Sequence, residues 1–521
     1  MSISSRLSKL RLFFWPIRFS ELKKFIPMFL MCFFICFIYS LLKVAKDTLV
    51  ITTSGAEVIP FIKVWAILPS ALLITMIFTK LTTRFKSSTI FYIMMGSFLS
   101  FFLLFAFVLY PLQDLLHPHA LANYLETVLP QGFHGLIAIF RNWTFTLFYV
   151  MSELWGTAIM TVLLWGFINQ VTRVEEAGRF YGILSVGSNI STALAGYIAM
   201  HPPSEPFLQL PYFCRSDPWG SCLMVITLII GLCGMSSIFL FRFLIKKVVG
   251  ESTIHIKADR KEVCCCGVIK SFKYLLKSKY LLCIAAIVFM YNISMNMIEI
   301  VWKDQVRELY TNRMDFMMYS GKIQIIMGIL SSVIAWIACS NVIKRCGWTR
   351  SALITPITFL ITGALFFFCF FFKESSYVSS LAMLLHTTPI ALAVFFGSAQ
   401  NCLTRSSKYT FFDATKEMAF IPLSNESKLQ GKAAIDGVGS RLGKSGGSLI
   451  YQFLLMVFGS VATSSPYVGI VLLISILIWI LATKSLGTKF NELTKPSQLA
   501  ESEVSNADDV TATLITKPVS L

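Results

Sequence analysis

Residues 25–42 read FIPMFLMCFFICFIYSLL and contain no charged side chain. An apolar run of this kind is typical of a membrane-spanning helix, because about 20 helical residues cross the roughly 30 Å hydrocarbon layer. The run follows a basic stretch, as the apolar core of a secretion signal does. It is too long for such a core, and no small-residue cleavage site follows it. We therefore expect it to be the first membrane span and to remain uncleaved.

The rest of the chain has the same character. Of its 521 residues, 55% are hydrophobic and only 14% are charged, and the mean hydropathy is +0.70. These values exclude a soluble globular protein. The sequence predicts an all-α polytopic membrane protein of about twelve spans, near residues 25–45, 60–79, 89–110, 136–165, 179–200, 220–243, 280–303, 320–340, 351–372, 377–400, 432–459 and 463–484.

The basic residues predict the orientation. Residues 1–24 hold six Lys and Arg, and the connection 242–279 holds ten against three acids, whereas 112–135 holds none. Since cytoplasmic loops are enriched in Lys and Arg, both termini and the middle loop are expected in the cytoplasm. The predicted domains are a basic N-terminus, a six-helix half, a basic linker, a second six-helix half and a polar tail, at 1–24, 25–243, 244–279, 280–484 and 485–521.

The net charge of +18 is then mainly a signal of topology. Nucleic-acid binding is the weaker interpretation, and membrane lipid is the expected surrounding. Cys264–Cys266 lie in the middle loop, where no His or second Cys pair has the spacing of zinc ligands. We expect neither a metal site nor a cofactor.

Polar residues inside the spans indicate a cavity. They form stripes at helical spacing, and each is costly in lipid, so the stripes should face protein or water. A shared aqueous cavity between two six-helix halves is expected. Structural ion pairs, such as Glu299 with Lys303, are the alternative. The stripes are Tyr39, Lys43 and Lys46 in the first span, Asn142, Thr146, Tyr149, Glu153 and Thr157 in the fourth, and Asn292, Asn296, Glu299 and Lys303 in the seventh.

The segment DGVGSRLGKSGGS (436–448) contains a Gly-Lys-Ser that is reminiscent of a phosphate-binding loop. Such a loop needs four residues between its first glycine and the Gly-Lys pair, but Gly437 and Gly439 leave five and three. Gly439, Gly443 and Gly447 recur instead at four-residue steps, a pattern that lets membrane helices approach closely. We therefore expect a packed helix, with Arg441 and Lys444 beside its glycine seam, and disfavour an ATPase. Two cations in a membrane cavity favour an anionic substrate.

Several longer motifs then become informative: KDTLV, SGAEVIPFIKVW, RNWTFTLFYVMSELWG, IEIVWK, KYTFFDATKEMAFIPL, GKAAIDGVGSRLGKSGGS and SPYVGIVLL. In this order they resemble the ATP/ADP translocases of chlamydiae, rickettsiae and plant plastids, from about residue 13 to residue 490. The WPI near the N-terminus looks most like the chlamydial members. The resemblance implies a major-facilitator-like nucleotide carrier and no enzyme. It also implies four critical charges, at Lys46, Glu153, Glu299 and Lys444, which the stripe and seam arguments also single out.

One departure from the family pattern bears on coupling. Family exchangers tend to read LRDTKDTL at the end of the first span, whereas this chain reads LLKVAKDTL, with Lys43 and Val44 in place of an Arg-Asp pair. The loss of a carboxylate favours net uptake of several nucleotides (ATP, ADP, GTP, UTP and CTP), coupled to protons. Strict ATP/ADP exchange is the alternative, and transport of another organic anion is less favoured.

The expected mechanism is alternating access around a central site. Lys43, Lys46, Arg441 and Lys444 are the candidates for the phosphates, because lysine is a flexible point charge that releases a ligand readily. Tyr149 or Trp143 is expected to stack on the base. Glu153 and Glu299 are expected to hold the lysines in the empty site or to bind a proton. Asn296 and Lys303 complete the predicted substrate-binding residues.

Overall fold

The computed structural model describes residues 17–202, 218–249, 278–424, 431–432, 435 and 440–515, so Cys264–Cys266 lie outside it. Every regular element in these ranges is a helix, which confirms the predicted fold class. The N-terminal half comprises η1 (Phe19–Glu21), α2 (Leu22–Ser54), α3 (Val58–Phe61), η2 (Ile62–Ile67), α4 (Leu68–Arg84), α5 (Ser87–Leu104), η3 (Phe105–Leu109), α6 (Gln113–Leu116), α7 (His119–Val128), η4 (Gln131–Phe133), α8 (His134–Arg141), α9 (Trp143–Leu154), η5 (Trp155–Leu164), α10 (Trp165–Val171), α11 (Val174–Met200), α12 (Pro218–Leu244) and η6 (Ile245–Val249).

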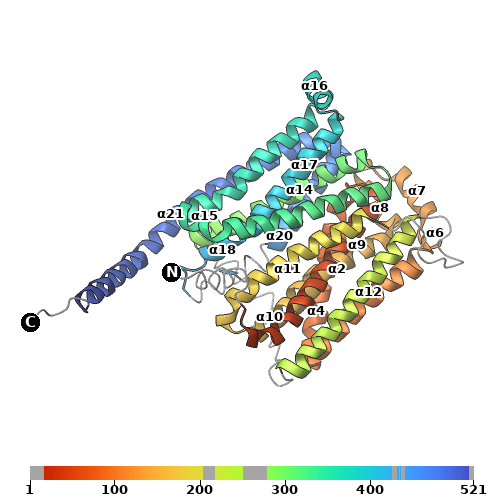
Figure 1. Ribbon diagram of the computed structural model, residues 1–521. Coiled ribbons are helices and arrows are strands. Elements are labelled where there is room, and N and C mark those ends of the chain that lie inside the picture. The colour runs from red at the N-terminus through yellow and green to blue at the C-terminus, as the bar shows by residue number, and fades with distance from the viewer. Residues whose placement is uncertain are drawn as a thin grey trace, which may run out of the picture.

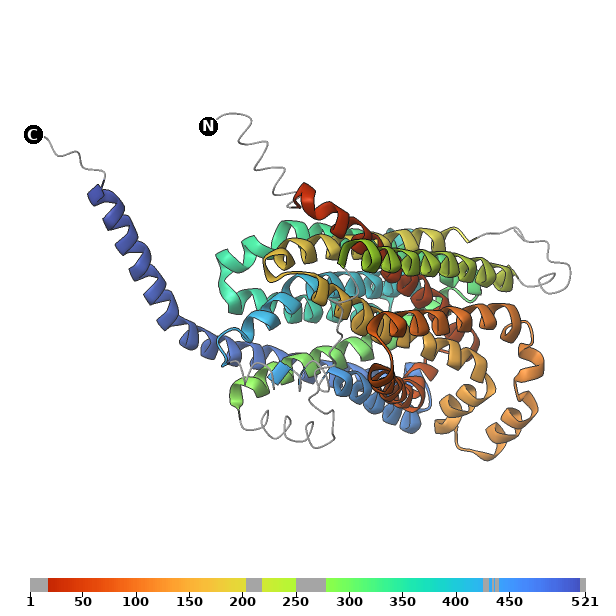
Figure 2. The same cartoon turned by 90° about the horizontal axis from the view of Figure 1, so that it is seen from below.

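The C-terminal half packs beside the first, and Figure 1 shows its green-to-blue helices next to the red-to-yellow ones. Two of its helices are unusually long. α15 is two helices joined at a kink, because Gly347 there has a φ of 78°. The end of α21 projects from the bundle (Figure 2). The elements are α14 (Lys279–Leu309), α15 (Arg313–Phe371), α16 (Ser376–Leu384), α17 (Pro389–Ser407), η8 (Lys408–Phe412), α18 (Asp413–Ala419), α20 (Ser440–Phe458) and α21 (Val461–Ile515).

The number of candidate spans comes close to the predicted count of about twelve. In the described residues ten helices are long and apolar enough to cross a membrane, or eleven if a bent pair counts as one span. The window 377–400 falls on that pair, which bends by 80° between α16 and the helix that Pro389 opens. The window 432–459 falls on α20, whose first turns read SRLGKSGGS and are too polar to resemble a span.

The two halves meet closely where α11 packs on α15. A Cβ atom at Gly196 of α11 would lie 2.6 Å from the carbonyl oxygen of Gly321 on α15, and the reverse distance is also 2.6 Å. Gly328 similarly approaches the carbonyl oxygen of Asn189, at 2.7 Å. Any larger side chain would clash with backbone, so glycine is what permits this contact.

A second glycine seam joins α20 to α14, as the four-residue pattern predicted. A Cβ atom at Gly443 would lie 3.0 Å from Asn292 Cβ, and one at Gly447 would lie 3.1 Å from Ile293 Cα. The third member of the pattern, Gly439, lies outside the described residues. The seam fixes α20, and with it Lys444, against the helix that carries Glu299.

Further contacts between the halves lie at the end of the bundle where α2 finishes, which we call the distal end. Arg313, the first residue of α15, donates to Thr53 Oγ1 (3.0 Å) and to the Tyr110 hydroxyl (3.2 Å). At Gly132 a Cβ atom would lie 2.9 Å from the carbonyl oxygen of Met456. Polar and backbone contacts therefore hold the halves together at the distal end.

Candidate functional site

A chain of ion pairs crosses the centre of the bundle. In the N-terminal half, the Nζ atom of Lys46 lies 2.5 Å from Glu153 Oε1 and 3.5 Å from Asp47 Oδ1. The same ammonium lies 3.7 Å from the ring centroid of Tyr149. Lys46 is only 2% exposed, so these groups compensate a charge whose burial would otherwise be costly. Helices α2 and α9 thus bring together three predicted residues, Lys46, Tyr149 and Glu153.

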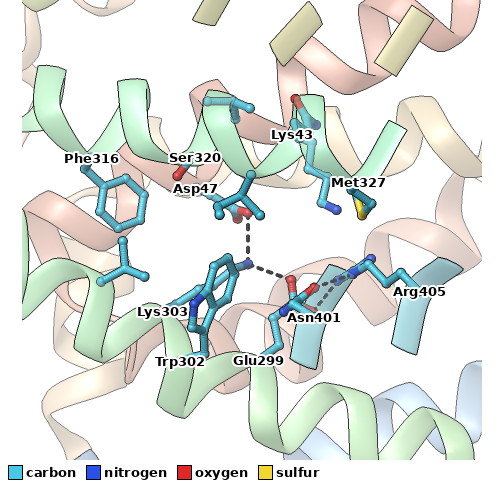
Figure 3. Close-up of a pocket in the computed structure, with 14 residues that line it drawn as sticks. Lys43, Asp47, Glu299, Trp302, Lys303, Phe316, Ser320, Met327, Asn401 and Arg405 are labelled. Atoms are coloured by element: carbon cyan, nitrogen blue, oxygen red, sulfur yellow. Dashed lines mark hydrogen bonds and ion pairs between the residues drawn. The ribbon is translucent and has the colours of Figure 1, made fainter. Parts of the chain in front are cut away.

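The chain of charges continues into the C-terminal half. Lys303 Nζ lies 2.9 Å from Asp47 Oδ2 and 3.1 Å from Glu299 Oε1. Arg405 of α17 approaches the other oxygen, Glu299 Oε2, at 2.9 Å (Figure 3). Negative and positive charges therefore alternate from Glu153 on α9 to Arg405 on α17, and the link between Asp47 and Lys303 joins the two halves.

The halves hold these charges in opposite order. In the first half the cation Lys46 is on α2 and its acid Glu153 is on α9, whereas in the second the acid Glu299 is on α14 and its cation Arg405 is on α17. A π-helical segment begins shortly after each outer member, η5 two residues after Glu153 and η8 three residues after Arg405. Such segments occur frequently at functional sites, because they shift the side chains that follow.

A cavity lies beside the part of the ion-pair chain that belongs to the C-terminal half (Figure 3). It encloses about 50 Å³ and is formed by α2, α14, α15 and α17. Both halves contribute to its wall, since Lys43 and Asp47 come from the first half and Glu299 and Arg405 from the second. Its lining residues are Lys43, Val44, Asp47, Glu299, Trp302, Lys303, Val306, Phe316, Ser320, Ile323, Gln324, Met327, Asn401 and Arg405.

Lys43 is the cation of this cavity that has no ionic partner. Within the part of the chain that the structure describes, no carboxylate oxygen lies within 4 Å of its ammonium. Arg405, by contrast, is held twice, by Glu299 and by Asn401 Oδ1, which accepts from its Nε at 2.7 Å. The cavity therefore presents one uncompensated positive charge to any ligand that enters.

Asn296 connects three helices beside the ion chain. Its Oδ1 accepts a hydrogen bond from Lys63 Nζ of η2, and its Nδ2 donates to the carbonyl oxygen of Lys444 (3.0 Å) and to Ser448 Oγ (2.6 Å). Lysine can only donate and a carbonyl can only accept, so these partners fix the orientation of the amide. Asn296 thus ties the second span of the first half to α20.

The remaining predicted residues differ in position. Lys444 lies inside α20 with an exposed side chain, and the Gly-Lys-Ser segment is helical, so it is not a phosphate-binding loop. The side chain of Arg441 lies outside what the structure describes. Trp143 is 39% exposed and its Nε1 donates to the carbonyl oxygen of Leu116 at 2.9 Å. The structure therefore does not bring Trp143 to the ion chain, since it begins α9 far from Glu153.

The charges of the site do not balance. The cations outnumber the carboxylates by three in the described part of the site, so an anion is the ligand that it would attract. They are Lys43, Lys46, Lys63, Lys303, Arg405 and Lys444 against Asp47, Glu153 and Glu299.

Sequence reasoning missed three members of the site. Asp47 directly follows Lys46 in KDTLV, and Lys63 lies in SGAEVIPFIKVW, so both were within motifs already noticed. Arg405 precedes KYTFFDATKEM but lies beyond the window 377–400 that was expected to hold the span. The helix continues past that window to Ser407, so it includes Arg405, whose guanidinium reaches Glu299 of α14.

Comparison with known proteins identifies the family of this chain. A sequence model of the family described as TLC ATP/ADP transporter matches residues 1–490. The chain belongs to this family. The resemblance that the motifs indicated is thereby confirmed, and the family consists of transporters and not of enzymes.

Relatives within the TLC family cover nearly the whole chain. It is 42% identical to "ADP,ATP carrier protein 2" of Chlamydia pneumoniae over 93% of this chain and 92% of the relative. It is 37% identical to the chloroplastic "ADP,ATP carrier protein 1" of Arabidopsis thaliana, over 94% and 77%. Among solved structures, a bacterial homologue of the iron transporter ferroportin in an inward-facing state shares the fold, with a TM-score of 0.53, 15% identity, and 90% and 100% coverage.

Proposed function

We propose that this protein carries ATP and ADP across a bacterial inner membrane by alternating access. The observation that carries the proposal is the excess of positive charge around a cavity to which both halves contribute. A nucleotide phosphate tail brings about three to four negative charges, and in a medium of low dielectric constant this complementarity is strong. The chlamydial, rickettsial and plastid relatives are named as ADP,ATP carriers, which is why we propose these nucleotides as the substrates.

The contacts suggest a division of roles among the candidate residues. Lys43 and Lys444, which lack ionic partners in the described residues, are the proposed first contacts of the phosphates. Lys46 and Lys303 are released from their carboxylates as the phosphates replace these. Tyr149 is buried under the Lys46 ammonium, so its proposed role is to hold that lysine and not to stack on the base.

The cavity is too small for a nucleotide as it stands. Its 50 Å³ compares with about 300–1,000 Å³ for typical ligand pockets. Binding therefore requires the halves to move apart, which alternating access supplies. The cross-half contacts of Arg313 and Gly132 lie at the distal end, so we propose that this conformation is closed there and opens toward the other side.

A second candidate function is net uptake of several nucleotides (GTP, UTP and CTP beside ATP) with protons. It is favoured by Val44, which lines the cavity where family exchangers carry an acid. Glu153 and Glu299 would then be the proposed proton-binding groups, as the carboxylates that pair with Lys46 and Lys303 in the empty site.

Counterflow in proteoliposomes tests both candidates. We expect external labelled ATP to enter vesicles that contain ADP, with no ATP hydrolysis. An imposed inward proton gradient should raise the rate only if the second candidate is right, and a protonophore should then abolish that rise. Uptake of phosphate or sugar phosphate without nucleotide would refute the nucleotide assignment.

The orientation is a separate proposal, in which the distal end faces outward and both termini and the 244–279 linker are cytoplasmic. His119 is exposed on α7 and Asn491 is exposed near the opposite end of the last span. We expect a membrane-impermeant thiol reagent to label His119→Cys from outside intact cells and to leave Asn491→Cys unlabelled until the cells are permeabilised. Labelling of Asn491→Cys alone would reverse the orientation.

A further inference from the structure

One ion pair has a special position. Of the ion pairs among the described residues, only Asp47 with Lys303 joins the two halves. Both residues are 6% exposed. Apart from Lys303, the one cation within 4 Å of Asp47 among the described residues is the Lys46 ammonium, at 3.5 Å, and Asp47 Oδ1 accepts no hydrogen bond in the described structure. Its charge therefore depends on two lysines that we propose as phosphate ligands.

The pair lies between the cavity and the distal end. Asp47 is seven residues before Ser54, the end of α2, and Lys303 is six residues before Leu309, the end of α14. These separations correspond to about 10 Å along each helix. Glu299 lies one turn deeper. When the distal side opens, α2 and α14 must separate here, and the pair must break.

We infer that the Asp47–Lys303 ion pair is a lock, meaning that it opposes reorientation of the empty carrier and so makes this carrier an exchanger. This inference rests on the proposed nucleotide transport. In the empty carrier, separating the pair would leave the ion chain of the first half (Glu153, Lys46 and Asp47) with one excess negative charge and that of the second half (Lys303, Glu299 and Arg405) with one excess positive charge. Pulling these opposite charges apart in a buried setting is unfavourable. In the loaded carrier, phosphate oxygens neutralise Lys303 and Lys46, and Asp47 is released toward water that enters the opening distal side. Reorientation is therefore fast with nucleotide bound and slow without it.

The inference assigns Asp47 a positioning role that the motif alone did not reveal. It also favours the exchange alternative over net uptake, because net uptake requires the empty carrier to return. Lys43 cannot take over the role of Lys303, because it lies on α2 together with Asp47 and so cannot join the two halves. The decisive quantity is the ratio of net uptake into empty vesicles to exchange with vesicles that contain ADP.

The variant Asp47→Asn tests the lock. We expect the wild type to show a low ratio of net uptake to exchange, and Asp47→Asn to raise that ratio about tenfold or more, because no charge pair then opposes return of the empty carrier. Asp47→Glu, which keeps the carboxylate, should restore the low ratio. The matched control is Asp413→Asn, which breaks the 2.9 Å pair with Lys408 inside one half and should leave the ratio unchanged.

The two assays distinguish a failure of the lock from a failure of the proposed nucleotide transport. An unchanged ratio in Asp47→Asn, or a wild type that takes up nucleotide equally well into empty vesicles, would overturn the lock while nucleotide transport stands. If the wild type moves no nucleotide in either assay, the proposed function itself fails.

If Asp47→Asn is inactive in both assays, the accessibility of a cysteine at position 306 tests the lock instead. Val306 lines the cavity on the distal side of Lys303 and is 1% exposed. We expect an impermeant thiol reagent to label Val306→Cys from the distal side without nucleotide only when Asp47→Asn is also present, relative to the same proteins without Val306→Cys. Equal labelling with and without Asp47→Asn would refute the lock.

Discussion

Replacing Lys46 by methionine is expected to lower nucleotide transport by about 100-fold or more, because removing one partner of a buried ion pair leaves the other uncompensated. The ammonium is 2% exposed and lies against Glu153, Asp47 and the ring of Tyr149. Methionine keeps the length of the side chain but not its charge. Both the empty site and the proposed phosphate contact are therefore disrupted at once.

The measurement is the exchange rate in proteoliposomes, normalised to the amount of folded protein. Lys46→Met combined with Glu153→Gln should regain thermal stability, since both charges are gone, but should not regain transport. Lys80→Met, an exposed lysine of α4, provides the control of equal chemistry and should transport normally. Full transport by the double variant would show that Lys46 is a structural partner of Glu153 and no substrate ligand.

Replacing Lys444 by alanine is expected to lower the affinity for nucleotide about 100-fold, because a charge-assisted contact to a phosphate is lost. The side chain is exposed on α20 and has no ionic partner in the described residues, so its loss should not destabilise the fold. Ser445→Ala should bind normally. In a phosphate-binding loop the same serine would hold magnesium and would be indispensable.

Nucleotide binding to purified variants in detergent distinguishes these effects. Lys444→Arg should bind nucleotide poorly, because the larger and more rigid guanidinium group must fit beside the glycine seam that packs on Asn292 and Ile293. Gly443→Leu should instead lower stability, since its side chain would clash with Asn292. Retained affinity in Lys444→Ala, or lost affinity in Ser445→Ala, would contradict the assignment.

The sequence predicted the class of fold from the length of its apolar runs, and it predicted several members of the candidate site from the helical spacing of polar residues. Membrane spans are read from apolar length alone, which is a local property, so the starts of α2 and α14 were predicted within three residues, although the two helices run nine and six residues past the predicted ends. The spans that differ are those where local composition misleads, at the bend before Pro389 and at the polar start of α20. Faces of helices follow from spacing, which is why Lys46, Glu153, Glu299 and Lys303 were found together.

Trp143 shows the limit of that reasoning. Its aromatic ring suits stacking on a base, but helical spacing does not give the depth of a residue in the bundle, and Trp143 lies exposed at the start of α9. Tyr149 was placed correctly on the stripe, yet its ring is covered by Lys46. A sequence pattern does not specify which side chain of one helix covers a given side chain of another helix.

By itself, the sequence determined that this chain is an all-helical membrane protein with cationic and acidic stripes, and its motifs indicated the transporter family. Only the tertiary structure decided the partners: that Asp47 pairs with Lys303 across the halves, that Arg405 completes the chain of ion pairs at Glu299, and that Lys43 pairs with no carboxylate of the described residues. The physical reason is that helical periodicity is set by residues three and four apart, whereas these pairs join residues far apart in the chain. Their contacts depend on how closely the helices approach, which the glycines at Gly196, Gly321 and Gly443 permit.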